Sequence, residues 1–238
     1  MPVSGLKANA RRLMTENAPK LFYVSIVYIV ISTIMSELEI RLPGTSSAYV
    51  LFLERLAAGE MPSPSVFYSN LRPSGVALTT VLMLLQLVIA AGYKRYCMKI
   101  NRGQGGDYKD IFEGFQFFSK IILLSILSAI LVFLWSLLFV FPGIMAFYRY
   151  RQAYYILLDD PEKGALQCIR ESGRLMAGKK LDLFLLDLSF FAWILLNYAV
   201  VTLLPLPFAL PLIMIWLDPY RGLTLAAYYD SLINKLLV

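Results

Sequence analysis

The sequence predicts an all-α integral membrane protein, a polytopic bundle of about six transmembrane helices with short amphipathic helices on the cytoplasmic side. Apolar residues make up 58% of the 238 positions and charged residues 16%, against about 25% charged residues in ordinary soluble domains. The mean hydropathy is +0.64. A soluble core of this size cannot bury so much apolar surface, whereas a lipid bilayer accommodates it.

Six apolar segments are predicted to cross the membrane, each bounded by charged residues or by a proline- or glycine-containing turn. The predicted spans are residues 21–36, 76–97, 121–141, 144–158, 183–204 and 208–229. The fourth is short and unusually polar. With their loops the spans use the whole chain, so a single domain over residues 1–238 is expected.

Three basic, amphipathic segments are predicted to lie on the cytoplasmic side of the bundle. Residues 1–20 place apolar side chains at helical spacing among lysines and arginines. Residues 107–120 begin with an aspartate that is suited to cap a short helix. Residues 161–178 follow Asp160, a good N-cap, and start with Pro161, a good first helical position.

The distribution of lysine and arginine predicts the orientation. Fifteen of them fall in residues 1–20, 94–120 and 163–180, which share one side of a six-span bundle. The long loop on the other side holds three: Arg41, Arg55 and Arg72. Because basic loops stay in the cytoplasm, both termini are predicted to be cytoplasmic, in a multi-pass protein of the inner cell membrane. The basic clusters are expected to meet anionic lipid headgroups, and nucleic acid is not an expected partner.

Polar residues inside predicted spans are the candidates for a functional site, because each is costly in lipid unless it is paired or hydrated. The predicted intramembrane cluster consists of Arg149, Arg151, Asp187, Asp218, Tyr150 and Tyr154. At 1.5 Å per residue, Arg149 and Asp218 lie near the midplane, and Arg151 and Asp187 lie roughly 10–12 Å deep. These depths predict the ion pairs Arg149–Asp218 and Arg151–Asp187. The pairs either lock the bundle or form a substrate or proton path, and both interpretations require contact.

Proline and glycine mark two predicted helix breaks. Pro142 and Gly143 follow the third span, as a tight outer turn or as a broken helix of the kind that marks transporter sites. Pro219 follows Asp218 in the middle of the sixth span, where a break is harder to explain as a turn.

The sequence offers no pattern for catalysis, a metal or a cofactor. It contains no histidine, and its two cysteines, Cys97 and Cys168, fall in segments assigned to the cytoplasmic side, where thiols stay reduced. Paired acids at catalytic spacing and a serine in a nucleophile elbow are both absent from the sequence. The chain is therefore expected not to be an enzyme, with no catalytic residues, no metal ligands and no cofactor.

Several stretches of the chain resemble one bacterial family. They include Phe141-Pro142-Gly143-Ile144, Tyr154-Tyr155-Ile156-Leu157, Glu171-Ser172, Gly92-Tyr93, Asp110-Ile111-Phe112-Glu113-Gly114-Phe115 and Ala226-Ala227-Tyr228-Tyr229. The family that the chain resembles is domain of unknown function 975, and the resemblance is densest over residues 141–184. The resemblance implies a multipass membrane protein of a family whose function is unknown and which occurs mainly in Gram-positive bacteria. It supplies no catalytic residues.

These observations favour a non-enzymatic protein of the bacterial cytoplasmic membrane, of an accessory, immunity or envelope-homeostasis type. The alternative is a small transporter or permease subunit with a polar path around Arg149 and Asp218. A sealed, ion-paired interior favours the first hypothesis, and a water-reachable cavity favours the second.

Overall fold

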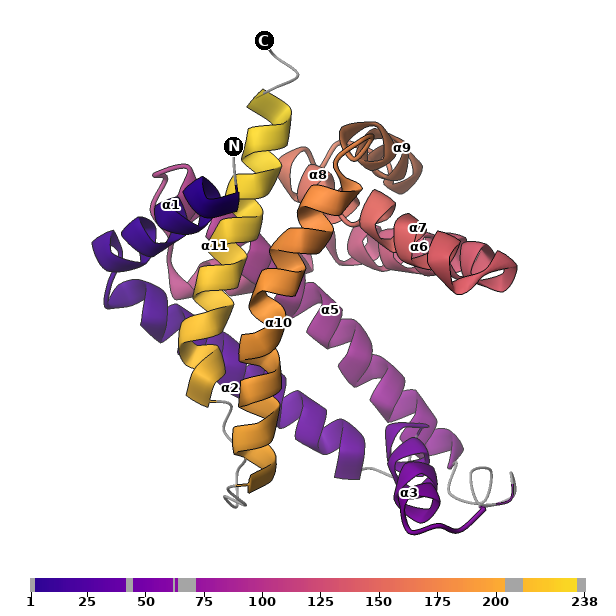
Figure 1. Ribbon diagram of the computed structural model, residues 1–238. Coiled ribbons are helices and arrows are strands. Elements are labelled where there is room, and N and C mark those ends of the chain that lie inside the picture. The colour runs from indigo at the N-terminus through magenta and orange to yellow at the C-terminus, as the bar shows by residue number, and fades with distance from the viewer. Residues whose placement is uncertain (1–2, 42–44, 62, 64–71, 204–211, 235–238) are drawn as a thin grey trace. The chain divides into compact units, whose positions relative to one another are not determined.

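The computed structural model describes residues 3–41, 45–61, 63, 72–203 and 212–234 (Figure 1). The secondary structure of these residues is entirely helical, which confirms the predicted all-α class. The chain divides into two compact units, a smaller one formed by residues 30–87 and a larger one formed by residues 1–29 and 88–238.

The smaller unit contains the second half of α2 (Lys20–Arg41), all of α3 (Thr45–Ala57) and the first half of α5 (Pro73–Asn101). Within it, the Gln86 side-chain amide donates a 3.3 Å hydrogen bond to the Ser36 hydroxyl and so joins α5 to α2. With thirteen residues, α3 is too short to cross a bilayer.

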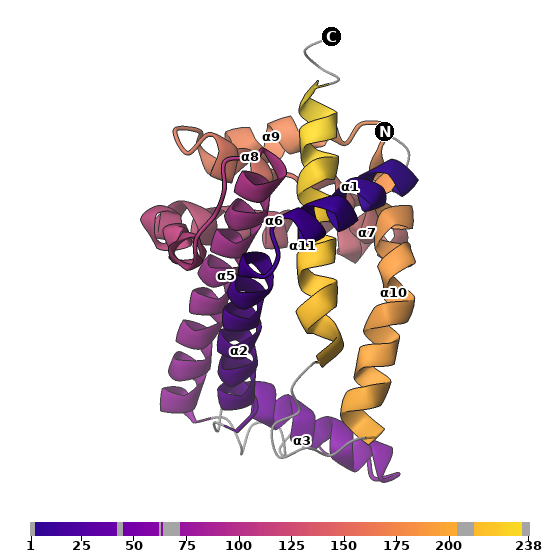
Figure 2. The same cartoon turned by 90° about the vertical axis from the view of Figure 1, so that its left-hand side faces the viewer.

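The larger unit contains the remaining helices. They are α1 (Val3–Glu16), the 3-10 helix η1 (Tyr108–Phe117), α6 (Phe118–Leu138), α7 (Val140–Tyr150), α8 (Ala153–Asp159), α9 (Ala165–Leu175), α10 (Lys180–Leu203) and α11 (Leu212–Asn234). In this unit α6 and α7 form an antiparallel hairpin, α10 packs beside α11, and α1 crosses α11 (Figures 1 and 2).

Four helical segments among the described residues are long and apolar enough to cross a membrane. They are Lys20–Arg41, Pro73–Asn101, Tyr108–Leu138 and Lys180–Val200, and they match the first, second, third and fifth predicted spans. Large apolar side chains stay exposed on them, such as Val81 on α5 and Phe191 on α10, as lipid-facing surfaces require. The start of the predicted sixth span, residues 208–211, lies outside the described residues, and α11 covers the rest of it.

The predicted fourth span, residues 144–158, is not one helix. α7 ends at Tyr150 and α8 begins at Ala153, and neither approaches the ~20 residues that a crossing needs. The interruption falls on Arg151 and Gln152, the polar residues in the middle of this run. Six crossings therefore stay a prediction.

The break predicted at Pro142 and Gly143 lies three residues earlier in the structure. Phe139 has an extended backbone (φ −165°, ψ 158°) and separates α6 from α7. Pro142 is therefore in the first turn of α7, where a missing N–H needs no helical partner. Gly143 lets α7 approach α6, because a Cβ atom there would lie 2.1 Å from the Ser136 hydroxyl oxygen.

Pro219 does not end a helix. It lies inside α11, which continues from Leu212 to Asn234. A proline at this position removes the hydrogen bond to the carbonyl of Ile215 and leaves the rest of the helical ladder in place. Helices in lipid tolerate such a loss where neighbouring helices pack around it.

Two of the predicted amphipathic segments are helices with one buried face. α1 buries four apolar side chains and packs against α11: Leu6, Ala10, Leu13 and Met14. α9 begins at Ala165 with Gly164 as its N-cap, so the predicted start at Pro161 is wrong. Asp160 instead accepts a hydrogen bond from the backbone N–H of Glu162 and closes a turn (3.2 Å). That these helices lie on a membrane surface stays a prediction.

Two glycines allow η1 to pack on α5 at backbone distance. A Cβ atom on Gly92 would lie 1.8 Å from the carbonyl oxygen of Ile111, and one on Gly114 would lie 2.2 Å from the carbonyl oxygen of Val88. Backbone atoms cannot rotate aside as a flexible side chain can, so both positions require glycine.

Gly92→Ala is therefore expected to lower the free energy of unfolding by about 1–3 kcal/mol, because η1 must move away from α5. Thermal unfolding of the purified protein in detergent measures the effect. Gly164→Ala is the matched control, since no atom lies within 4 Å of its Cβ position and only a helix cap is altered. Equal melting temperatures for the two variants would contradict the close packing.

Candidate functional site

One carboxylate joins two arginines that come from different segments of the larger unit. Arg151, between α7 and α8, donates from both terminal nitrogens to Asp187 of α10, with a distance of 3.1 Å from Nη2 to Oδ1. Nη2 of Arg221 on α11 lies 3.8 Å from the same Oδ1 atom. The Arg151 and Asp187 side chains are only 16% and 17% exposed. The predicted Arg151–Asp187 pair is confirmed, and Arg221 is a partner that the sequence did not reveal.

Aromatic rings cover the Arg151 side of this group. The guanidinium carbon of Arg151 lies 5.8 Å from the ring centroid of Phe147 and 5.9 Å from that of Tyr148. Tyr148 in turn meets Phe184 of α10 edge to face, with 5.8 Å between the centroids. Such rings replace part of the water that a guanidinium loses on burial.

Lys94 of α5 contributes a third cation. Its Nζ atom lies 5.0 Å from the ring centroid of Tyr154, whose hydroxyl donates to the Ser125 hydroxyl of α6 at 2.9 Å. Lys94 is also within electrostatic range of Arg151 and Arg221. We name Lys94, Arg151, Asp187 and Arg221 the Asp187 cluster. Sequence reasoning missed Lys94 because it counted this residue among the basic residues at the end of a span.

Arg149 and Asp218 do not come together, so this predicted pair is wrong. The Arg149 side chain is exposed and lies along α9, where a Cβ on Gly173 would be 2.9 Å from its Nε atom. Its guanidinium also lies 5.7 Å from the ring of Tyr150, which is buried. The predicted depth of Arg149 assumed one continuous helix from Arg149 to Asp159. Because the helix is interrupted after Tyr150, that estimate does not apply.

Asp218 lies one turn before Arg221 on α11 and interacts with it at longer range, and it forms no ion pair with the described residues. Nearby, α11 packs closely on α5, because a Cβ on Gly222 would lie 2.6 Å from the Cys97 sulfur. Cys97 and Cys168 are both buried, free thiols. Burial raises the pKa of Cys168, which keeps that thiol protonated and unreactive.

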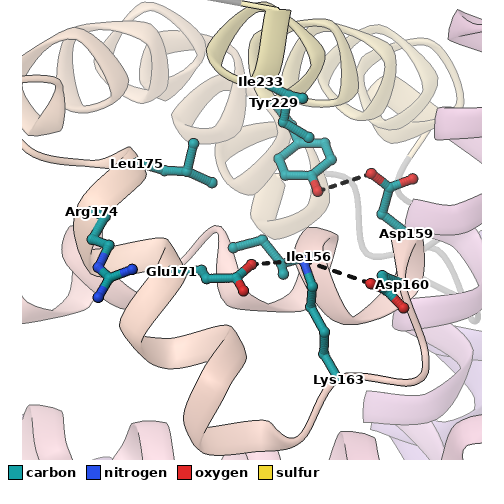
Figure 3. Close-up of a pocket in the computed structure, with 9 residues that line it drawn as sticks. All are labelled: Ile156, Asp159, Asp160, Lys163, Glu171, Arg174, Leu175, Tyr229 and Ile233. Carbon is teal, nitrogen blue, oxygen red and sulfur yellow. Dashed lines mark hydrogen bonds and ion pairs between the residues drawn. The ribbon is translucent and has the colours of Figure 1, made fainter. Parts of the chain in front are cut away.

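A pocket of about 730 Å³ opens where α8, α9 and α11 meet (Figure 3). Its charged side chains pair with one another across the opening. Nζ of Lys163 lies 2.8 Å from a Glu171 oxygen and 3.7 Å from an Asp160 oxygen. The Tyr229 hydroxyl donates to Asp159 at 3.2 Å. The residues of the predicted intramembrane cluster do not line this pocket.

A second polar network ties four helices together at the same end of the larger unit. Arg102 lies 2.5 Å from an oxygen of Asp159 and 2.7 Å from an oxygen of Asp230. Asn101 donates to Asp230 at 2.6 Å and accepts from Asn9 of α1 at 3.2 Å. No group of three or more His, Cys, Asp or Glu side chains is arranged to hold a metal ion in the described part of the chain.

Residues 137–235 match the model of the family described as protein of unknown function (DUF975). This match supports the resemblance to that family for the C-terminal part of the chain, residues 137–235. The DUF975 segment holds Arg151, Asp187 and Arg221, whereas Lys94 and the similar stretches around Gly92 and Asp110 precede it. No curated protein and no solved structure matches the chain.

The Lys163–Glu171 pair makes the stability of the α8–α9 region depend on pH. Burial acts to raise the pKa of Glu171, but hydrogen bonds from Lys163 and Gln167 outweigh it and hold that pKa below the ordinary value. The hydrogen bond to Glu171 also raises the pKa of Lys163. The stabilisation is therefore complete between the two unfolded pKa values, about 4.3 and 10.4. It is lost as pH falls through the lowered pKa of Glu171, or rises through the raised pKa of Lys163.

We expect Glu171→Gln to lower the melting temperature in detergent at pH 7, and the difference from wild type to shrink as the pH falls through the lowered pKa of Glu171, below which this residue is protonated in both states. Glu162→Gln is the matched control, because this exposed carboxylate on the adjoining turn makes no ion pair within the described residues. If the difference between wild type and Glu171→Gln stays constant from pH 7 down to the most acidic pH at which the protein remains folded, the pair does not form.

Asp187→Leu is expected to destabilise the protein by about 3–5 kcal/mol, because it leaves two guanidinium groups without their shared carboxylate. Arg151→Leu should cost less, since Asp187 keeps Arg221. The Arg151→Leu, Asp187→Leu double variant should lose less than the sum of the single variants. Unfolding in detergent measures all three.

Lys179→Leu and Asp182→Leu provide the matched control cycle. These side chains lie 3.8 Å apart but are 41% and 53% exposed, so their coupling should stay below about 1 kcal/mol. Simple additivity at Arg151 and Asp187 would mean that their contact contributes nothing to the fold.

Proposed function

We propose that this chain is a non-enzymatic integral membrane protein of the bacterial cytoplasmic membrane, with an accessory, immunity or envelope-homeostasis role. The main observation behind this proposal is that Asp187 is paired with both Arg151 and Arg221. Ionised groups are kept inside membrane proteins only when they are paired or serve a path for ions or substrates. Here the charges join three separate segments of the larger unit, which is what an internal lock requires.

The exposed surface supports placement in lipid. Between Leu137 and Phe141, at the tip of the α6–α7 hairpin, five consecutive large apolar side chains are 61–79% exposed. In water such a patch promotes aggregation, whereas acyl chains solvate it without cost. The four apolar helices and the match of the DUF975 segment support the same placement.

We infer that both termini lie in the cytoplasm, since the basic segments around α1, η1 and α9 require an even number of crossings between them. The α6–α7 hairpin is compatible with this condition in two arrangements. Either both helices cross the membrane and the tip at Phe139 reaches the external face, or neither crosses completely. In both cases the chain before α6 and the chain after α7 lie on the same side of the membrane.

A small transporter or permease subunit is the second candidate. The observation that favours it is the interruption between α7 and α8, because discontinuous helices line many transport sites. At this interruption Gln152 is buried, and its side-chain oxygen has no hydrogen-bond partner.

Reporter fusions at Ala58, Gln104 and Val238 are expected to give external, cytoplasmic and cytoplasmic signals respectively. A reporter inserted after Phe139 then separates the two arrangements of the hairpin. An external signal there supports six crossings, and a cytoplasmic or silent one supports a hairpin that does not cross. An external signal at Val238 would rule out the proposed topology.

Thiol labelling separates the two candidate functions. Single cysteines replace Leu186 and Leu223, both fully buried, in a Cys97→Ser, Cys168→Ser background. We expect a membrane-impermeant thiol reagent to leave both unmodified from either face of membrane vesicles, while a cysteine at exposed Gln104 reacts from the cytoplasmic face. Labelling of Leu186→Cys or Leu223→Cys from both faces would favour the transporter.

A further inference from the structure

The Asp187 cluster holds more positive than negative charge. Lys94, Arg151 and Arg221 are its cations, and Asp187 is the carboxylate within 4 Å of two of them. Asp218 adds a second negative charge at longer range from Arg221. Three cations against two carboxylates leave one positive charge without a counterion among the described residues of this group.

Two hydrogen-bond donors of the cluster are unused. The Nε atom of Arg221 is buried and has no partner. The ammonium group of Lys94 faces the ring of Tyr154 and is paired with no carboxylate of the described residues. Buried donors without an acceptor are rare in folded proteins, and an unbalanced cation inside a helical bundle is costly. These two donors lie where α11 packs closely on α5, since a Cβ on Gly222 would lie 2.6 Å from the Cys97 sulfur. One acceptor with negative charge would therefore satisfy both.

The cluster is closed on one side and open on the other. Arg151 and Asp187 are held between α10 and the α7–α8 junction, whereas the Arg221 side chain is 37% exposed. Near Arg151, the rings of Phe147 and Phe184 are both exposed. A ligand would therefore approach Arg221 from the surface of the unit, while the Arg151–Asp187 pair stays intact behind it.

We propose that Lys94 and Arg221 bind the phosphate group of an anionic ligand, either a lipid headgroup or free phosphate. Phosphate carries several acceptor oxygens, so it can accept from a guanidinium and an ammonium that approach from different helices. Asp187 positions Arg221 for this contact by holding its Nη2 atom. This inference goes beyond the proposed function, in which these charges have only a structural role. It depends on membrane placement only if the ligand is a lipid.

Thermal unfolding of the full chain in uncharged detergent tests the proposal, because a ligand that binds the folded state raises the melting temperature. The probes are inorganic phosphate, phosphatidylglycerol and phosphatidylcholine, whose zwitterionic headgroup also contains a phosphate but has no net charge and serves as the reference. We expect phosphatidylglycerol or phosphate to stabilise the wild type. Lys94→Gln and Arg221→Gln should each weaken this binding by roughly ten- to hundredfold, the loss of one charge-assisted hydrogen bond. Lys179→Gln, which removes an exposed cation, should bind like wild type.

The stability of Lys94→Gln without any added anion is a second readout. A residue with only a structural role would destabilise the protein when changed, whereas removal of an unbalanced charge should leave the melting temperature equal or higher. Stabilisation by phosphatidylglycerol alone identifies a lipid headgroup, and stabilisation by inorganic phosphate as well identifies phosphate itself.

The proposal is overturned if neither probe stabilises the wild type more than phosphatidylcholine does. It is also overturned if Lys94→Gln, Arg221→Gln and Lys179→Gln all bind alike, or if Lys94→Gln unfolds at a lower temperature than wild type in the absence of anion. None of these results depends on membrane orientation, so they are independent of the reporter fusions that test the proposed topology.

Discussion

Asp187 lies in an apolar helix, yet it accepts two hydrogen bonds from Arg151 and lies 3.8 Å from a nitrogen of Arg221. Removing one member of a partly buried ion pair costs far more than the pair itself contributes, because the remaining charge loses its water and its partner together. The arrangement of α7, α8, α10 and α11 therefore depends on this carboxylate. Apolar contacts alone would allow these helices to slide, since lipid solvates their surfaces equally well.

Near the C-terminal end of α11, at Asp230, the polar contacts have a different character. Arg102 bridges Asp159 and Asp230, and Asn101 connects Asp230 to Asn9 of α1. These groups border open pockets, so water can reach them, and their ion pairs are correspondingly weaker. The larger unit is thus held by one sheltered charge group along the helices and by a hydrated network near their ends.

The charges around Asp187 also distinguish the structural hypothesis from the transporter hypothesis. A path for ions or substrates needs polar groups along a continuous opening, whereas a lock needs them paired. Arg151 and Asp187 are paired, as a structural lock requires. Lys94 is outside this pair, and the Nε atom of Arg221 has no hydrogen-bond partner. An unbalanced cation beside a locked pair is the arrangement expected of a site that holds an anion without letting it through.

The sequence by itself determined the helical class and the apolar segments, because lipid requires every backbone group to be bonded within its own helix. The sequence also predicted the Arg151–Asp187 pair correctly. The depth of each residue was estimated over a few positions from the charged residues that end its span, so the error in depth was small. Sequence reasoning failed for Arg149, where the count passed through the interruption at Arg151, and for Pro219, which the packed α11 tolerates. Only the tertiary structure brought Arg221 to Asp187 and Lys94 to the ring of Tyr154, because contacts between helices far apart in the chain depend on packing that no local pattern encodes.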